Sequence, residues 1–448
     1  MNRNVVVVGG GLAGLAAAIY LARAGRSVTL FEKRRHLGGR AITTLRRGYR
    51  FNLGAHLFHR GGAGAVVCRE LGIPLRGKVA GARTVALLGD GSFRLPTGWG
   101  SLLATTLLSF RGKKELAAAF FRIRRSGGDH VEGSAGHWLD ATFTDARARD
   151  VMTALLRQAT MSDDCDVLDA RASLEQVKVS LQHALCIDEG WQKIVDSLQS
   201  AAISSGVNFV TSSRIIGVDH DGERVRSIEL GGLEFDADRM DTQSLAMPDP
   251  APQGVEGARI PASDVLLAVD PQTAAAMFPS EIDPRWKLAR PVTVATLDVA
   301  LASLPDPRNV LAVSIDQPMQ FGVHSAFAQL TPKGGALVHV TRCLRDANGA
   351  LDADERRPTH AVSATEQSME ELLDRLQPGW RSHVVHRRFL PAMTVANALP
   401  AVGARRPSPA TPIRGLYVAG DWVGDEGMLA DASLASARAA ARAILAAT

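Results

Sequence analysis

Six residues near the start of the chain, Gly9-Gly10-Gly11-Leu12-Ala13-Gly14, satisfy the spacing GxGxxG. In such a loop the first glycine permits a tight turn, the second lets the backbone approach a pyrophosphate, and the third allows a helix to pack closely. Glu32 follows about twenty residues later, where a carboxylate can accept hydrogen bonds from ribose hydroxyls. The chemistry that these residues predict is the binding of a dinucleotide.

Two further groups of residues can bind the rest of such a ligand. The glycine pair Gly38-Gly39 precedes Arg40, so backbone amides and a guanidinium can face phosphate. Near the C-terminus, Gly420 and Asp421 end a short apolar run, and an alanine-rich segment follows. Asp421 can bind a ribityl or pyrophosphate group, and a helix N-terminus can point at an isoalloxazine ring. A nicotinamide enzyme needs none of these additions, so the pattern favours FAD.

The elements that must position these residues form a βαβ unit. Residues 5–8 are four valines, which are typical of a buried parallel strand. Residues 14–24 are rich in Ala and Leu and predict a helix, and residues 28–31 predict the second strand. Another alanine-rich helix is expected at residues 430–447. The nucleotide-binding features therefore sit at both ends of the chain.

The middle of the chain has a different pattern. A hairpin is expected from residues 208–219 and 225–235, with a turn at Asp221-Gly222. Residues 241–262 are rich in Pro and Gly and predict a loop. Alternation of apolar and polar residues from 292 to 341 predicts several antiparallel strands.

The predicted fold class is α/β, with a Rossmann-type nucleotide-binding domain interleaved with an α+β substrate domain. We expect the first domain to comprise residues 1–75, 190–285 and 400–448, and the substrate domain residues 76–189 and 286–399.

Composition excludes several other classes of protein. The 448 residues are 46% hydrophobic and 22% charged, and the net charge of +5 is dispersed, so we expect no nucleic-acid partner. The four cysteines lie far apart without metal-ligand spacing, which predicts no metal site and suits a reducing cytoplasm. No signal peptide precedes the first strand, and no apolar run reaches the ~20 residues of a membrane span. We expect a cytoplasmic protein with, at most, peripheral membrane contact.

Four segments resemble the flavoprotein superfamily of amine oxidases, protoporphyrinogen oxidases and phytoene desaturases. They are GGGLAGLAAAIYLARAGRSVTLFEKRRHLGGRA (9–41), FNLGAHLF (51–58), DEGWQKIVDSLQSAA (188–202) and GLYVAGDWVGDEGMLADASLASARAAA (415–441). The resemblance covers most of the chain and implies FAD, bound by a glutathione-reductase-like domain. The insertion at residues 241–262 departs from the family pattern.

Carried over residue by residue, the resemblance implies a set of flavin contacts. They are Gly9, Gly11, Leu12, Ala13, Gly14, Glu32, Lys33, Gly39, Arg40, Gly54, Ala55, His56, Ile215 through its backbone, Gly420, Asp421, Met428 and Leu429.

The substrate side differs from that of the superfamily's amine oxidases, which typically frame the flavin with two aromatic side chains and place a lysine near N5. The only tyrosines are Tyr20, Tyr49 and Tyr417, and the first and last lie on the nucleotide-binding helix and in the C-terminal strand, where neither is well placed for such a cage. Met428 occupies the position of the C-terminal cage aromatic, and no lysine occurs between residues 287 and 333. These departures favour an apolar substrate over an amine.

We therefore expect an FAD-dependent, phytoene desaturase-like oxidoreductase that transfers hydride between a small lipophilic, isoprenoid or polyene-like substrate and flavin N5. Candidate pocket residues are Met319, Phe321, Phe327 and Met393, and candidate proton-handling residues are His56 and His324.

Several alternatives stay open at this point. Oxygen, a quinone or NAD(P) can be the electron acceptor. The chain can instead be an amine, amino-acid or porphyrinogen oxidase that uses oxygen, or a flavin-binding scaffold without turnover. Residues 99–125 combine apolar and basic side chains, which suits either a membrane surface or packing on the core.

Overall fold

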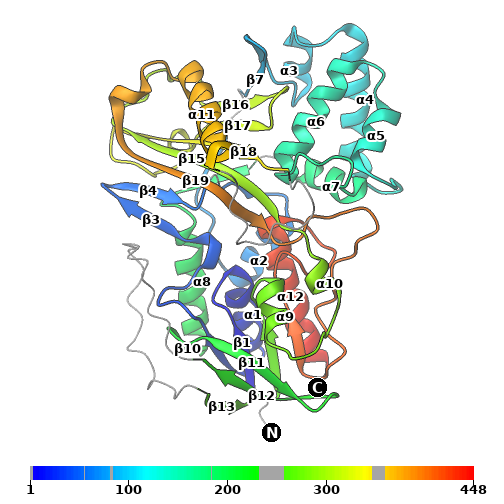
Figure 1. The fold of residues 1–448 in the computed structure, drawn as a ribbon, viewed down its shortest axis with the longest axis vertical. Helices are drawn as coiled ribbons and strands as arrows, with labels where there is room; N and C mark the ends of the chain where they lie inside the picture. Colours follow the sequence, from blue (N-terminus) through cyan, green and yellow to red (C-terminus); the bar gives the residue numbers. More distant parts are fainter. Residues whose placement is uncertain are drawn as a thin grey trace.

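The computed structural model describes residues 4–54, 56–80, 84–182, 184–231, 257–345 and 359–447. The chain forms two main sheets, which lie one above the other in Figure 1, with both termini at the lower sheet. The lower sheet has five parallel strands. In spatial order they are β10 (Asn208–Val210), β2 (Ser27–Phe31), β1 (Asn4–Val8), β14 (Asp264–Leu267) and β20 (Leu416–Val418).

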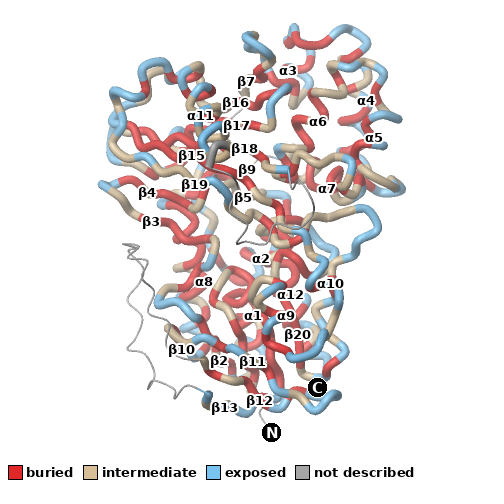
Figure 2. Tube along the Cα trace, in the orientation of Figure 1, coloured by how far each residue is buried: buried red, intermediate tan, exposed pale blue. Residues whose placement is uncertain are grey.

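Helices and a small antiparallel sheet bury the two faces of the five-stranded sheet. One face packs against α1 (Leu12–Arg23), α8 (Gln192–Ser204) and α12 (Leu429–Ala446). The other packs against the antiparallel strands β11 (Ile215–His220), β12 (Val225–Leu230) and β13 (Arg259–Pro261), and against α9 (Pro271–Ala276) and α10 (Arg285–Leu288). A central strand buried on both sides requires apolar residues at every position, which the four valines of β1 supply. Figure 2 shows this centre as buried.

The upper sheet has seven strands drawn from three parts of the chain. Their order is β19 (Val384–Ala396), β15 (Val292–Leu301), β18 (Ala336–Cys343), β17 (Met319–Val323), β16 (Leu311–Ser314), β7 (Val85–Leu88) and β8 (Gly91–Arg94). One face packs on α11 (Thr359–Leu376), through residues such as Leu297, Val340 and Leu373. The opposite face meets the loop after the hairpin of β3 (Thr43–Arg46) and β4 (Tyr49–Asn52).

A group of helices flanks the upper sheet on its other side in Figure 1. They are α3 (Trp99–Ala104), α4 (Phe110–Ser126), α5 (Ala135–Thr142), α6 (Ala146–Thr160) and α7 (Ala170–Ser180). Their shared core includes Leu116, Leu139 and Leu156 and reaches Val313 on β16. The helix α2 (Ala63–Leu71), the strands β5 (Phe58–His59), β6 (Gly77–Val79) and β9 (Ala184–Ile187), and the 3-10 turns η1 (Gly39–Ala41), η2 (His324–Ala326) and η3 (Trp380–His383) complete the chain.

Two expectations are corrected in the region from 208 to 262. The predicted strand at 208–219 is divided, because Ser212 adopts a left-handed conformation and its N–H donates to the carbonyl of Arg34. The first part therefore joins the parallel sheet as β10, and only β11 pairs with β12 as a hairpin. Most of the predicted loop at 241–262 lies outside the described residues, but its end is a strand, β13, rather than a loop.

The two sheets draw on separate stretches of sequence. Strands of the five-stranded sheet fall at residues 4–31, 208–210, 264–267 and 416–418, and those of the seven-stranded sheet at 85–94, 292–343 and 384–396. We propose that the domain boundaries follow this division, as expected from the sequence.

Candidate cofactor and substrate site

In the glycine loop between β1 and α1, one glycine borders open space and the other glycines are closely packed. A Cβ on Gly14 would lie 1.9 Å from the carbonyl oxygen of Gly9, and Gly9 itself has a φ of +106°. Both glycines are therefore required by the fold of the loop. A Cβ on Gly11, in contrast, would have no atom within 4 Å. The space beside Gly11 is where a ligand can approach the backbone.

The N-terminus of α1 faces this space without a side-chain cap or an acidic residue in its first turn. Its backbone N–H groups, which include those of Leu12 and Ala13, are thus available to an anion, and the helix dipole favours negative charge there. Both side chains are buried. The geometry fits a pyrophosphate at this end of the helix.

Glu32 is turned toward the loop that it was expected to serve. One carboxylate oxygen accepts from the Gly10 N–H at 2.7 Å, and the other from the Arg34 N–H at 2.9 Å. These bonds fix the carboxylate, and each oxygen keeps a second lone pair for a ribose hydroxyl. Lys33 beside it is exposed, and Ile215 starts β11 just after the segment whose Ser213 N–H donates to the Glu32 carbonyl. The ribose and adenine contacts remain our proposal.

The second glycine pair lies directly against the first. The Gly38 N–H donates to the Gly10 carbonyl at 2.8 Å, and a Cβ on Gly39 would lie 3.5 Å from the Cα of Gly11. This contact brings Arg40 to the same place, on η1. The two motifs, which are separate in sequence, thus form one corner beside the open backbone at Gly11.

Asp421 connects this corner to the C-terminal segment. Its Oδ2 accepts from Arg40 Nη2 at 2.7 Å, and its Oδ1 accepts from Asn397 Nδ2 at 2.9 Å. The carboxylate is buried, whereas the Arg40 side chain is 41% exposed. A phosphate at the loop would therefore find Arg40 already oriented by Asp421.

The start of α12 is fixed by contacts of its own. The Gly420 N–H donates to Ser436 Oγ at 2.9 Å, so the end of β20 is tied to the helix. Met428 precedes the helix and is buried, and Leu429, its first residue, has a φ of +55°. Asp431 in the first turn accepts from the Gly64 N–H at 2.7 Å and so caps α2. This acidic residue makes the N-terminus of α12 less positive than that of α1.

The loop after β4 passes between the two sheets. Gly54 has a φ of +75°, and a Cβ there would lie 2.6 Å from Met393 Cε and 3.0 Å from Thr296 Cγ2. Ala55 lies outside the described residues. His56 places its ring edge-on to Trp191, with centroids 4.9 Å apart, and its Nδ1 lies 3.1 Å from the Gly54 carbonyl oxygen. Burial lowers the pKa of His56 to about 4, so the ring is neutral at pH 7.

The four predicted pocket residues do not lie together. Met393 on β19 touches the position of Gly54. Met319 and Phe321 are buried on the opposite face of the upper sheet, in the core that includes α11. They are therefore separated from Met393 by the sheet itself, since neighbouring positions along a strand point to opposite faces. Phe327 follows η2 and packs against a third core with Tyr49 and Phe51.

A buried polar cluster lies on the sheet face that Gly54 contacts. Asp298 of β15 accepts from His339 Nδ1 of β18 at 2.7 Å, and its second oxygen accepts from Arg388 Nε of β19 at 3.0 Å. Arg388 also donates to the carbonyl of Asn52, at the end of β4. His324 completes the cluster, with its ring centroid 4.4 Å from that of His339.

Sequence reasoning found His324 but missed the other members of this cluster. The available signal was a charged or polar residue within an apolar strand: Asp298 within VTVATLDVAL and His339 within ALVHVTRC. A buried charge is costly unless paired, so such an interruption indicates a partner on a neighbouring strand.

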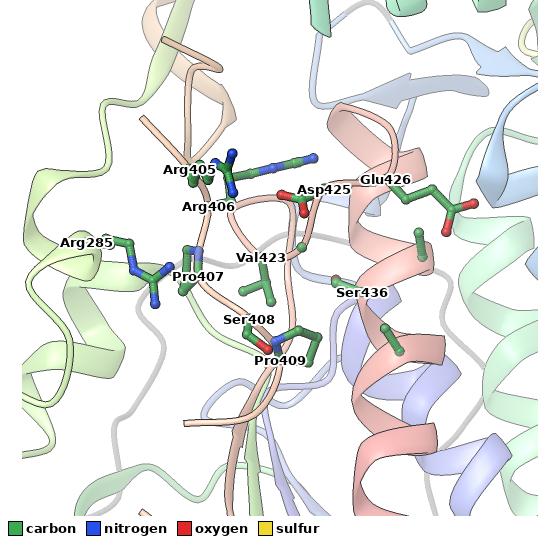
Figure 3. A pocket seen from close by; sticks show the side chains of 13 residues that line it. Arg285, Arg405, Arg406, Pro407, Ser408, Pro409, Val423, Asp425, Glu426 and Ser436 are labelled. Carbon is green, nitrogen blue, oxygen red and sulfur yellow. The ribbon is translucent and has the colours of Figure 1, made fainter. Parts of the chain in front are cut away.

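A cavity of about 390 Å³ lies between the start of the C-terminal segment and α12 (Figure 3). Its lining combines Arg285, Arg405 and Arg406 with Asp425 and Glu426. None of its lining residues belongs to the glycine loop, to the loop after β4 or to the buried cluster. Because its charges are of both signs and partly paired, we assign it no ligand.

In the part of the chain that the structure describes, each helix is too short or too polar to span a bilayer. No group of three or more His, Cys, Asp or Glu side chains in the described part of the chain is arranged to hold a metal ion.

Comparison with protein-family models gives a match over residues 12–445 to the flavin containing amine oxidoreductases. A carotenoid 3,4-desaturase from Haloarcula japonica is 55% identical over 53 residues, which are 12% of this chain and 11% of that protein. The alignment thus spans about a ninth of that relative's length.

Solved structures resemble the whole chain. An oxidoreductase from Methanosarcina mazei is similar with a TM-score of 0.72 at 16% identity, covering 99% of this chain and 100% of the other. A cyclohexylamine oxidase from Brevibacterium oxydans is similar with a TM-score of 0.66 at 14% identity, covering 100% and 99%. At these identities the likeness concerns the fold, and it confirms the predicted Rossmann-type α/β class.

Proposed function

We propose that this chain, which belongs to the family of flavin-containing amine oxidoreductases and uses FAD as its cofactor, oxidises an apolar isoprenoid or polyene-like substrate by hydride transfer to flavin N5. The chain is an FAD-dependent oxidoreductase. The bound flavin supplies the two-electron chemistry, and the protein determines which substrate reaches it. The choice of an apolar substrate rests on the residues around Gly54.

The carrying observation is that lysine and tyrosine are missing from the strand and loop nearest Gly54. The strand β15, whose Thr296 would contact a Cβ on Gly54, has the sequence VTVATLDVAL and contains no lysine. The tyrosines are held elsewhere: Tyr20 donates to Glu70, Tyr49 donates to the Leu301 carbonyl, and Tyr417 is buried in β20. The nearest side chain from β19 is Met393, an apolar and adaptable residue. An amine cage with a lysine has no counterpart in these positions.

The arrangement of the FAD end supports the same proposal. The open backbone at Gly11, the uncapped N-terminus of α1 and Arg40 would hold the diphosphate, and Glu32 the ribose. With the diphosphate held there, the loop containing Gly54 and the upper sheet would lie toward the flavin ring. The short match to a carotenoid desaturase favours a polyene among apolar substrates.

Anaerobic titration of the FAD-loaded protein tests this function. An acyclic polyene carried in liposomes should bleach the flavin absorbance, whereas cyclohexylamine and putrescine should leave it unchanged. Rapid bleaching by either amine would reject the proposal in favour of amine oxidation. If no polyene, amine or porphyrinogen changes the redox state of the flavin, the result instead supports a flavin-binding scaffold without turnover.

We further propose that helices α3 and α4 bring the protein to an anionic lipid surface. Four large apolar side chains there, Trp99, Leu103, Phe110 and Phe121, are each at least 59% exposed. The inner face of α4 does pack on the core, so the exposed face is the part left for a partner. Exposed basic residues accompany it: Lys114, Arg122, Arg124 and Arg125. A mixed apolar and basic face is typical of interfacial helices.

This surface would let a lipophilic substrate enter from a bilayer. All four cysteines are free thiols, which suits the cytoplasmic side of a membrane. Co-sedimentation with liposomes containing phosphatidylserine should fall about tenfold in the double variant Trp99→Ser/Phe110→Ser, because each substitution removes an apolar anchor. Leu288→Ser is the matched control, since Leu288 is 74% exposed on the distant helix α10. Equal binding by the double variant and the control would reject the surface.

A further inference from the structure

Alternation along the central strands places one set of polar side chains on the face near Gly54. Asp298 pairs with His339 across β15 and β18, and Thr296 pairs with Thr341 two positions away. These four residues share a face because positions two apart point the same way. The intervening residues lie in the core against α11. A Cβ on Gly54 would touch Thr296, so the polar face is turned toward the loop that we assign to the flavin.

Asp298 holds His339 in one orientation. Its Oδ1 lies 2.7 Å from His339 Nδ1, and its Oδ2 lies 3.0 Å from Arg388 Nε and 2.5 Å from Arg388 Nη2. Burial alone would raise the pKa of Asp298, but His339 and Arg388 outweigh it and keep the pKa below its usual value. An ionised Asp298 can only accept hydrogen bonds, so Nδ1 of His339 carries a proton and Nε2 is the ring nitrogen left to other partners.

The Nε2 atom of His339 is buried and has no hydrogen-bond partner among the described residues. The same is true of Nδ1 of His324, whose ring stands beside that of His339. Leaving such an atom unpaired costs about 1–3 kcal/mol, so a structural role for His339 explains its Nδ1 bond but not its free Nε2. An oriented base with an open acceptor atom is the usual arrangement of a proton-transferring histidine.

The neighbouring histidines do not compete with His339 for the proton. Burial lowers the pKa of His324 well below its usual value, and a positive charge on His339 or His56 would lower it further. Burial likewise lowers the pKa of His56 to about 4, and neither ring bonds a carboxylate oxygen as His339 does. Among the described residues, the charged group that His339 bonds is Asp298 of β15, which Arg388 of β19 also contacts. The Asp298 carboxylate at Nδ1 would balance the positive charge that a proton added at Nε2 gives the ring.

We propose that Nε2 of His339 accepts the proton released when the substrate is desaturated, with Asp298 and Arg388 as positioning residues. This inference rests on the proposed function. Two C–H bonds on neighbouring carbons break: one carbon loses hydride, whose electron pair reduces the flavin, and the other loses a proton to Nε2. The electrons of the second bond form the new C=C bond, so the substrate is oxidised by two electrons. His339 thus replaces His56 and His324, which the sequence suggested for this step.

The first test concerns the histidine itself and needs no substrate. Nitrogen-15 NMR of the FAD-loaded protein, labelled at histidine, should show His339 as a neutral ring with the proton on Nδ1 at pH about 7. Asp298→Asn should disturb that tautomer, because an amide can also donate to Nδ1. The signal is assigned by its loss in His339→Gln. A doubly protonated His339 at neutral pH would overturn the proposal, since Nε2 would then be unable to accept.

The second test measures the proton transfer. In anaerobic bleaching of the flavin by a polyene, His339→Gln should slow the reaction by about 10²–10⁴-fold and remove the decline in rate at low pH. His130→Gln is the matched control, because His130 is exposed between α4 and α5 and lies outside the upper sheet. An unchanged pH profile in His339→Gln, with FAD still bound, would overturn the proposal. If the polyene fails to bleach the wild-type flavin, the proposed function fails, and the NMR result still decides whether His339 offers a base.

Discussion

We assign the glycine corner and the cluster around Asp298 to one site, but the two are built in different ways. The corner is made of backbone atoms from two short segments of the chain. Gly9, Gly11 and Gly14 are needed there because they have no side chain. The cluster is made of side chains from three strands and from η2, and Asp298 and Arg388 lie ninety positions apart in the chain. Backbone sites depend on local conformation, whereas side-chain clusters depend on the register of distant strands.

The corner and the cluster also differ in what they contribute to the stability of the protein. In the corner, the space left beside Gly11 contributes nothing to the stability of the empty protein. In the cluster, the carboxylate of Asp298 and its partners are buried together, so each is needed to offset the desolvation of the others. Changes in the cluster should therefore affect folding first, and changes beside Gly11 should affect FAD binding first.

The largest expected effect is from Asp298→Ala. This change leaves Arg388 in the interior without its carboxylate and should lower the free energy of unfolding of the apoprotein by about 3–5 kcal/mol. Asp219→Ala is the matched control, because Asp219 forms an exposed ion pair with Arg259 between strands, and its loss should cost less than about 1 kcal/mol. Urea unfolding followed by tryptophan fluorescence measures both. Equal losses of unfolding free energy in the two variants would show that the cluster matters no more for stability than an exposed ion pair.

A smaller effect, divided between stability and binding, is expected for two glycines of the loop. Gly14→Ala places a Cβ against the Gly9 carbonyl and should destabilise the apoprotein by about 2–3 kcal/mol. Gly11→Ala meets no atom within 4 Å and should leave apoprotein stability within about 0.5 kcal/mol. The same Gly11→Ala methyl occupies the ligand's space, so its affinity for FAD should fall about 10–100-fold. Flavin fluorescence titration measures that loss, and normal FAD affinity in Gly11→Ala would show that the diphosphate lies elsewhere.

The difference between local backbone structure and contacts of distant strands also explains what could be predicted from the sequence. The strand of valines, the glycine loop and Glu32 follow one another within about thirty residues, so their structure is local and the sequence predicts it well. The meeting of Gly38 with Gly10 was not predicted, but both glycine pairs were recognised as phosphate-binding segments.

The upper sheet was harder to predict because strand order is not a local property. The sequence predicted antiparallel strands after residue 292, but not that Met319 and Phe321 point toward α11 while Met393 points toward Gly54. A shift of one position in register exchanges the two faces, so pocket residues on a strand cannot be assigned without its neighbours. The ion pair of Asp298 and Arg388 depends on the same register and was missed for the same reason.

The smallest expected effect concerns how the free energy of unfolding changes with pH, through the loop after β4 that lies between the two regions. The folded-state pKa of His56 is about 4, below the usual value of about 6.5, so the unfolded chain binds a proton that the folded chain does not. The free energy of unfolding should therefore fall as the pH drops from about 6.5 toward about 4, and the contribution of His56 cannot exceed about 1.4 kcal/mol per pH unit. His56→Asn should reduce this slope, whereas His130→Asn, at an exposed position, serves as the histidine control. Urea unfolding at a series of pH values gives the slopes. If His56→Asn keeps the wild-type slope, the loop after β4 admits water to His56. The loop would then not exclude water from the space between the corner and the cluster.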